Sequence, residues 1–349
     1  MTRAAIAFSV TSFLPVPLLV LAALFGGVWA WAALIYLTLF TFAMDELVAV
    51  VTQETAADRE FPAADALSVA LAVAHFGLLG LVVAAFGRGM GRDMGLAEAV
   101  ALFLATGLFF GQVGNSNAHE LIHRGNRGLH GLGKWVYISL LFGHHASAHP
   151  QVHHRYVASD RDPNSARLGE GYYRFALRAW VGSFRAGFRA EADRQRRGLH
   201  PYVEYFAGAA VFLALAGWIG GWAGVLALFG LAAYAQSQLL ISDYVQHYGL
   251  RRRMLPDGRL EPVGARHSWD SRHVFSSHLM LNAPRHSDHH AHPMRRFPDL
   301  TLTDPNSSPT LPRSLPTMSV LALLPPLWRR VMDPRVARWQ GDQPGKVAP

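Results

Sequence analysis

The residues best suited to chemistry in this 349-residue sequence are its 18 histidines, in a chain that has no cysteine. Nine of them stand in three tight clusters and at one further position. They are His119 and His123; His149, His153 and His154; His286, His289 and His290; and His247. Histidine is the commonest metal ligand, and positions i and i+4 share one face of a helix. The spacing therefore predicts that each cluster presents its imidazoles together, to a metal.

The number of histidines predicts two metals. A zinc site needs three or four ligands, so nine imidazoles imply two ions with four or five nitrogens each. Imidazole suits zinc, copper, iron and nickel, and open coordination positions beside a membrane cavity favour iron and oxygen chemistry. The sequence His119-Glu-Leu-Ile-His123 is also the HExxH motif of zinc proteases, with Glu120 as general base. An intramembrane zinc protease leaves the other seven histidines unexplained, and a non-catalytic metal-binding or transport protein is a further alternative.

The composition indicates the elements that must hold these histidines. Hydrophobic residues make up 51% and charged residues 16% of the chain, where soluble domains carry about 25% charged residues. Stretches 13–44, 66–86 and 206–242 contain no charge, and about 20 apolar residues span a bilayer. We therefore expect an all-α, polytopic membrane protein with about six transmembrane helices.

The distribution of charge predicts the topology of one membrane domain, 1–349. All but four of the 32 Lys and Arg residues lie in 124–197 and 251–346. Because basic loops stay in the cytoplasm, this asymmetry reflects topology and predicts no nucleic-acid partner, despite the net charge of +8. We expect four transmembrane helices in 13–114, followed by a cytoplasmic segment 115–202 that carries the first two clusters. Two more transmembrane helices follow in 203–242, with a bend near Gly220 and Gly221. The last segment, 243–349, is again cytoplasmic and carries His247 and the third cluster. Within that last segment, 318–331 is predicted to form one short interfacial helix.

The histidine motifs resemble those of a known family. His119-Glu-Leu-Ile-His123, the HxxxHH pattern of 149–154, His247-Tyr-Gly and Arg285-His-Ser-Asp-His-His290 are similar to the integral-membrane alkane monooxygenases, within the histidine-box superfamily of membrane desaturases and hydroxylases. The resemblance covers roughly 10–340. It implies a non-haem di-iron centre with the nine histidines as ligands. It further implies hydroxylation of the terminal carbon of alkanes with O₂, and electrons from a rubredoxin or ferredoxin with its reductase. We expect a bacterial inner-membrane protein, with a lipid or fatty-acyl desaturase or hydroxylase as the nearest alternative.

The sequence departs from the family pattern at three places. Ala148 and Gln246 stand where the family usually has glutamate before a histidine, and Ala283-Pro284 replaces Leu-Gln before the third cluster. Residues beside metal ligands set their orientation and the metal's electronic properties. These departures are compatible with a metal site and weaken any prediction of the exact substrate.

Two further groups of residues are candidates for supporting roles. Asp288, His145 and Glu120 stand next to ligands or one helical turn from one, where side chains commonly accept a hydrogen bond from a ligating imidazole. On the second of the predicted transmembrane helices, Trp31, Tyr36 and Phe40 are predicted to line a blind apolar tunnel that admits only the end of a hydrocarbon chain. The alternative for each of these aromatic side chains is packing against neighbouring helices or lipid. With no cysteine to hold an internal electron-transfer centre, the reductant must be a separate protein.

Overall fold

The computed structural model describes residues 2–47, 61–88, 94–194, 198–304 and 306–341. Within these ranges the regular structure is helical, apart from the isolated bridges Met254 to Leu260 and Asp270 to Thr310. The all-α fold predicted from the sequence is therefore confirmed.

Five helical stretches of the described chain are long and apolar enough to cross a membrane. They are Arg3–Phe25 (α1 Arg3–Phe13 and α2 Pro15–Phe25), Gly27–Leu47 (α3 Gly27–Ile35, η1 Tyr36–Phe40 and α4 Thr41–Leu47), Ala64–Arg88 (α5), Leu96–Ile122 (α6 Leu96–Leu108, η3 Phe109–Gly114 and α7 Asn115–Ile122) and Pro201–His247 (α12). The segments η1 and η3 are π-helical turns, which occur mostly as insertions in α-helices near functional sites.

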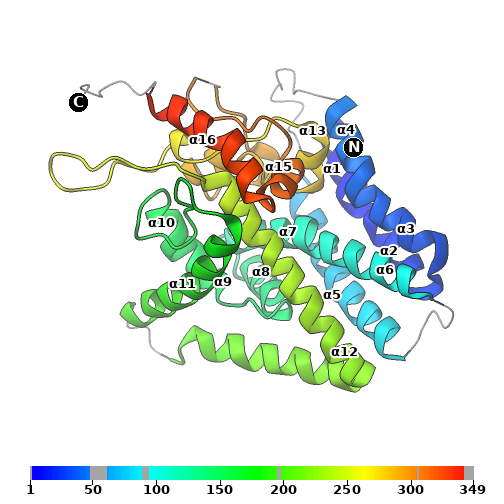
Figure 1. The fold of residues 1–349 in the computed structure, drawn as a ribbon. Coiled ribbons are helices and arrows are strands. Elements are labelled where there is room, and N and C mark those ends of the chain that lie inside the picture. Colours follow the sequence, from blue (N-terminus) through cyan, green and yellow to red (C-terminus); the bar gives the residue numbers. More distant parts are fainter. Residues whose placement is uncertain (1, 48–60, 89–93, 195–197, 305, 342–349) are drawn as a thin grey trace.

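The bend in α12 explains why five stretches stand where the sequence predicts six. Its 47 residues would measure about 70 Å if straight, more than twice the hydrocarbon thickness of a bilayer. At Gly221 the backbone takes φ 59° and ψ −152°, a conformation that glycine adopts at little cost, and the helix turns back on itself (Figure 1). Six membrane crossings, with the two arms of α12 counted separately, stay a prediction.

Close contact between backbones holds this bend against the bundle. A Cβ atom added to Gly87 at the end of α5 would lie 2.1 Å from the Cα of Gly220. Small residues permit such contacts between membrane helices, and dispersion forces stabilise them in the absence of a hydrophobic driving force. The largest apolar core of the described residues then runs through α2, α3, α5, α6 and α12.

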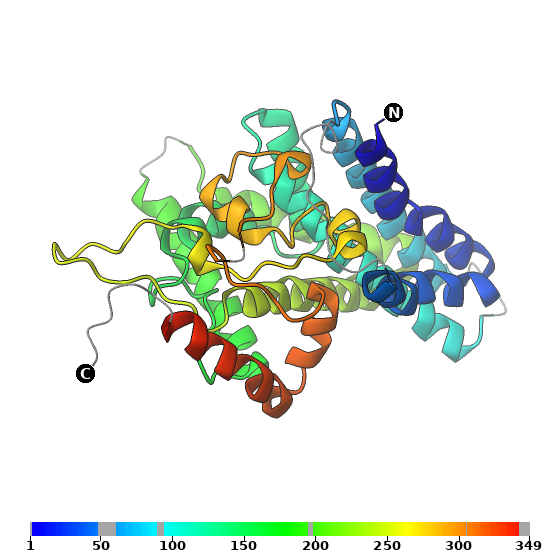
Figure 2. The same cartoon turned by 90° about the horizontal axis from the view of Figure 1, so that it is seen from above.

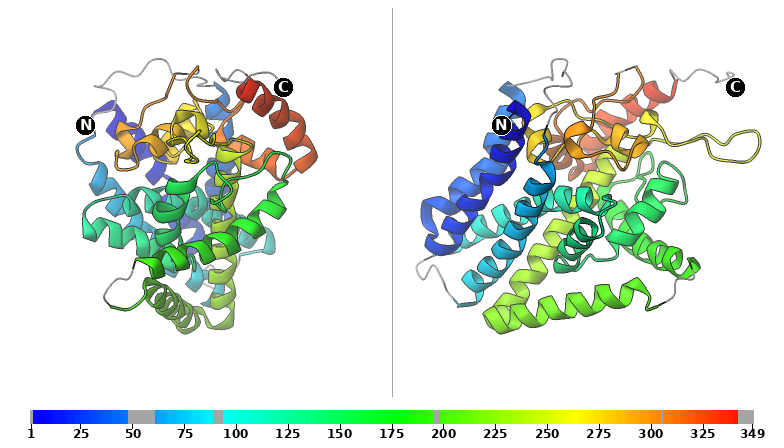
Figure 3. Two further views of the ribbon diagram at one scale, coloured as in Figure 1. Left: turned by 90° about the vertical axis from the view of Figure 1, so that its left-hand side faces the viewer. Right: turned by 180° about the vertical axis from the view of Figure 1, so that it is seen from behind.

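The remaining helices lie outside these five stretches and carry most of the histidines. They are α8 Arg127–Ser139, α9 His145–Ala148, η4 His149–His153, α10 His154–Tyr156, α11 Tyr172–Asp193, η5 Ala265–His267, α13 Val274–Leu279, α14 His286–Ala291, η6 Phe297–Asp299, α15 Leu315–Ala322 and α16 Pro325–Gly341. Figures 2 and 3 show that α13 to α16 gather over the end of the bundle where α12 finishes and α1 begins.

The single interfacial helix predicted for 318–331 is wrong in its boundaries. The helix α15 ends at Ala322, and α16 begins at Pro325. Proline has no backbone N–H to donate to the preceding turn, and its ring disfavours a helical residue before it, so the Pro325-Pro326 pair starts a new helix. The break matters because α15 contributes to the cavity described below.

Candidate metal centre

Nine buried or half-buried histidines from four parts of the chain meet in two adjacent groups. The first group is His119, His123, His149, His154 and His289, and the second is His153, His247, His286 and His290; the ligand atoms within each group lie within 4.8 Å of one another. They come from α7 and the residue after it, from η4 and α10, from the last residue of α12, and from α14. All nine histidines expected at the metal site are thus brought together.

The spacing between nitrogens in the first group fits a shared ion. The Nε2 atom of His149 lies 2.7 Å from Nε2 of His119 and 2.8 Å from Nε2 of His154. Nε2 of His289 lies 3.1 Å from Nε2 of His154. Two imidazole nitrogens bound at right angles to one ion, each at about 2.1 Å, are about 3.0 Å apart. The observed distances match that expectation.

The second group repeats this arrangement. Nε2 of His286 lies 3.0 Å from Nε2 of His247 and 3.1 Å from Nε2 of His290. The Nε2 atom of His153 is buried without a hydrogen-bond partner among the described residues. The rings of His154 and His290, one from each group, have centroids 4.5 Å apart, so the two groups adjoin.

Hydrogen bonds on the outer side of the rings fix which nitrogen faces inward. Nδ1 of His153 lies 2.9 Å from the Oδ2 atom of Asp162, and Nδ1 of His247 lies 3.2 Å from the carbonyl oxygen of His267. Because only a protonated Nδ1 can donate to these oxygens, Nε2 keeps its lone pair for a metal. Asp162 is a supporting residue that the histidine pattern alone does not identify; its only sequence signal is the Asp162-Pro163 pair after the second cluster.

Burial favours the neutral form, which binds metal, in four of these imidazoles outside the spans. It lowers the pKa of His149, His154, His289 and His290 well below the usual range, and the neighbouring histidines lower it further. His153 behaves oppositely: although burial alone would lower its pKa, the charge of Asp162 and the hydrogen bond to it raise that pKa. The Asp162 carboxylate therefore stabilises positive charge on this ring, whether a proton or a metal ion supplies it.

The three residues predicted to support the ligands lie at the site in different ways. Glu120 accepts a hydrogen bond from the backbone N–H of Phe297 at 2.9 Å and pairs with Arg124. It thereby ties α7 to the C-terminal segment, a role unlike that of a protease general base. Asp288 accepts hydrogen bonds from the Thr301 N–H at 2.8 Å and from His292, a histidine outside both groups.

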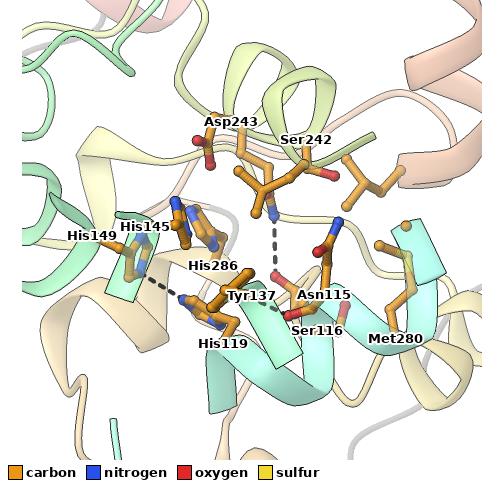
Figure 4. Close-up of a pocket in the computed structure, with 15 residues that line it drawn as sticks. Asn115, Ser116, His119, Tyr137, His145, His149, Ser242, Asp243, Met280 and His286 are labelled. Atoms are coloured by element: carbon orange, nitrogen blue, oxygen red, sulfur yellow. Dashed lines mark hydrogen bonds between the residues drawn. The ribbon is translucent and has the colours of Figure 1, made fainter. Parts of the chain in front are cut away.

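His145 is close to the centre without belonging to it. Its ring centroid lies 4.9 Å from that of His149, and it belongs to neither of the two groups. It lines a small cavity, the histidine cavity, together with His119, His149 and His286 (Figure 4). The volume of the histidine cavity is about 50 Å³.

A much larger space, the chain cavity, adjoins the histidine cavity. Its volume is about 710 Å³, in the range of small-molecule sites. Most of its wall is contributed by the second span, η3, α11, α12 and α15, with apolar side chains that include Leu37, Leu39, Phe42, Leu108, Ile241 and Val320. The two cavities share Gly111, Ser242, Met280 and Leu315 as lining residues. The chain cavity therefore borders the cavity that the histidines line.

The aromatic residues predicted to line the tunnel lie elsewhere on the second span. The Tyr36 ring packs on Phe40 with centroids 5.3 Å apart, and its hydroxyl donates to the Thr11 carbonyl at 3.0 Å. Phe40 packs edge-on against Phe275, and Trp31 is 45% exposed. The second span instead contributes Leu37, Thr38, Leu39 and Phe42 to the chain cavity.

Comparison with known proteins agrees with this geometry. Residues 96–322 match the family model described as fatty acid desaturase. Alkane 1-monooxygenase 1 of Pseudomonas aeruginosa is 35% identical over 260 residues, which cover 72% of this chain and 68% of the relative. The chain belongs to the membrane alkane monooxygenase family.

Two further relatives show how far the similarity extends. Alkane 1-monooxygenase 2 of Pseudomonas aeruginosa is 36% identical over 248 residues, 69% of this chain and 65% of the relative. The chain thus spans about two thirds of the length of these alkane 1-monooxygenases. The xylene/toluene monooxygenase hydroxylase component XylM of Pseudomonas putida is 28% identical over 334 residues, 90% of this chain and 85% of the relative.

Proposed function

We propose that this protein is a membrane monooxygenase that hydroxylates the terminal carbon of alkane chains, with two iron ions held by the nine histidines. The observation that carries the proposal is the adjoining pair of cavities: an apolar chamber large enough for a hydrocarbon chain shares its wall with the chamber lined by His119, His149 and His286. Lipid-soluble chains would reach it from the bilayer.

The reaction consumes an alkane, O₂, two electrons and two protons, and gives an alkanol and water. Bound iron would supply the redox chemistry that activates O₂. The chain itself supplies neutral imidazoles with their Nε2 atoms facing inward, the Asp162 carboxylate behind His153, and an apolar wall that orients the substrate and excludes water. Orienting the reacting carbon in this way removes much of the entropic barrier.

The small volume of the histidine cavity supports selectivity for a chain end. A space of about 50 Å³ accommodates a methyl terminus better than a folded chain segment. Internal C–H bonds are weaker, so an open site would oxidise them first. We therefore expect primary alcohols as products.

The electrons would come from a rubredoxin or ferredoxin with its reductase. The sequence contains no cysteine and so offers no thiolate ligands for an iron–sulfur or rubredoxin centre of its own. The basic residues of 124–197 and 251–346 favour a location of the histidine site on the cytoplasmic side of the inner membrane. The same positive charge would attract an acidic electron-donor protein.

Metal analysis and product analysis of the purified protein test the proposal. We expect two irons per chain and, with octane, O₂, NADPH, ferredoxin and ferredoxin reductase, mainly 1-octanol. Octenes in place of alcohols would indicate the desaturase alternative, and one zinc without iron would indicate the protease. Secondary octanols as the main product would contradict the proposal that only the end of the alkane chain reaches the metal centre.

A further inference from the structure

Two glutamine side chains lie where the chain cavity meets the histidine cavity. Gln112 and Gln238 both line the chain cavity, and Gly111, which precedes Gln112, lines both cavities. A Cβ atom added to Gly111 would lie 2.5 Å from Cγ of Gln238, so the Gln238 side chain rests directly on the Gly111 backbone. The junction of the two cavities is therefore flanked by amides.

The Gln112 amide is incompletely paired. This side chain is only 8% exposed, and its Oε1 atom is buried without a hydrogen-bond partner among the described residues. A buried polar atom that lacks a partner costs free energy, and each such atom in a native structure calls for an explanation. Since the amide carries both an acceptor and two donors, rotation about its last bond can offer either to a ligand.

Five of the hydroxyl groups that line the chain cavity are already committed as donors. Each gives its proton to a backbone carbonyl oxygen: Thr38 to Leu34 at 2.6 Å, Ser237 to Tyr234 at 2.7 Å, Ser319 to Leu315 at 2.8 Å, Tyr172 to Ser237 at 2.9 Å and Tyr173 to Leu323 at 3.0 Å. These oxygens can still accept but not donate. The Gln112 amide, by contrast, carries two N–H donors that rotation can turn towards a ligand oxygen.

We infer that the preferred substrate is a hydrocarbon chain that carries an oxygen function, a hydroxyl or carbonyl, which hydrogen bonds to Gln112. This inference rests on the proposed function and narrows its substrate class. Gln112 precedes His119 by seven residues, roughly 10 Å along a helix, so the oxygen function lies several carbons from the carbon that is oxidised. A plain alkane would leave the amide unpaired, and sites with buried polar groups discriminate against ligands that lack the matching group.

A competition assay tests the inference. The wild-type protein, loaded with iron and supplied with ferredoxin, ferredoxin reductase and NADPH, receives equimolar octane and 1-nonanol at low conversion. We expect nonane-1,9-diol to exceed 1-octanol by about tenfold, the value of one well-formed hydrogen bond. The Gln112→Leu variant should bring this product ratio close to one. Thr38→Val is the matched control, because it removes a hydroxyl in the same cavity whose proton is bonded only to Leu34, and it should keep the wild-type ratio.

The product ratio is measured within one sample, so it does not depend on how much of a variant is folded. Comparison of the variant with the wild type also cancels the different partitioning of the two chains into detergent. If the leucine variant has no turnover, Gln112→Ala replaces it. A wild-type ratio of one or less, or a ratio unchanged by loss of the Gln112 amide, would overturn the inference. Absence of both products in the wild type would instead refute the proposed function.

Discussion

Replacing Asp162 with asparagine should weaken metal binding by removing one charge-assisted hydrogen bond. The carboxylate accepts bonds from His153 Nδ1 at 2.9 Å, from Ser165 Oγ at 2.7 Å and from the Asn164 N–H at 3.0 Å. An amide in the same place has one acceptor oxygen, so at least one of these donors must face its NH₂ group. A hydrogen bond to a charged group contributes about 1.5–3 kcal/mol, which corresponds to about a 10- to 100-fold loss in iron affinity or turnover. Substitution of partners behind metal ligands commonly costs that much.

The assay compares iron content and octane turnover of purified Asp162→Asn with those of Asp160→Asn. Asp160 is a suitable control because its side chain is 82% exposed and lies 3.6 Å from Arg251, away from the histidines. The control should match the wild type in both measurements. Wild-type iron affinity and turnover in Asp162→Asn would refute the role assigned to this carboxylate.

Four other outcomes are expected. Alanine at His119, His153 or His289 should lower iron content and abolish turnover, and full activity would remove that residue from the ligand set. Gly111→Ala places a Cβ atom 2.5 Å from Cγ of Gln238, between the two cavities. It should reduce octane turnover about tenfold or more at unchanged iron content, because the substrate chain is misplaced. Loss of iron would show that the substitution also distorts the metal site. With NADPH and O₂ alone the protein should be inactive until a rubredoxin or ferredoxin with its reductase is added, and turnover without them would contradict an external donor. Chelation of the metal should lower Tm, because a metal that binds only the folded state stabilises that state. Its removal also leaves buried imidazole nitrogens without partners. An unchanged Tm would argue against metal binding at this site.

The sequence predicts which histidines come together but not how they are distributed between the two groups. Spacing of i and i+4 places His119 and His123 in one group, as expected for an α-helix. His149 and His153 have the same spacing yet lie in different groups, and His154 joins His149. The cause is the π-helical turn η4, in which residue i aligns with i+5. No pattern of residue types in the sequence signals that turn.

The lining of the chain cavity is likewise only partly predictable from the sequence. The sequence predicts that the second span lines the substrate tunnel, and residues of that span do line the chain cavity. Trp31, Tyr36 and Phe40 do not line this cavity. The size and aromaticity of a residue do not reveal the direction of its side chain, and the sequence does not signal the π-helical turn η1 at Tyr36–Phe40. The contributions of α11 and α15 depend on tertiary packing between segments about 140 residues apart, for which local periodicity gives no signal.

The order of the histidines along the chain bears on how the enzyme matures. Six of the nine precede α14, and each group is completed only by residues of α14: His289 for the first, and His286 and His290 for the second. During synthesis the first 285 residues, including all five membrane-spanning stretches, therefore exist before either group is complete. Metal can therefore fill both groups only after these five stretches have been synthesised, so a metal-free chain that already contains them precedes the loaded protein.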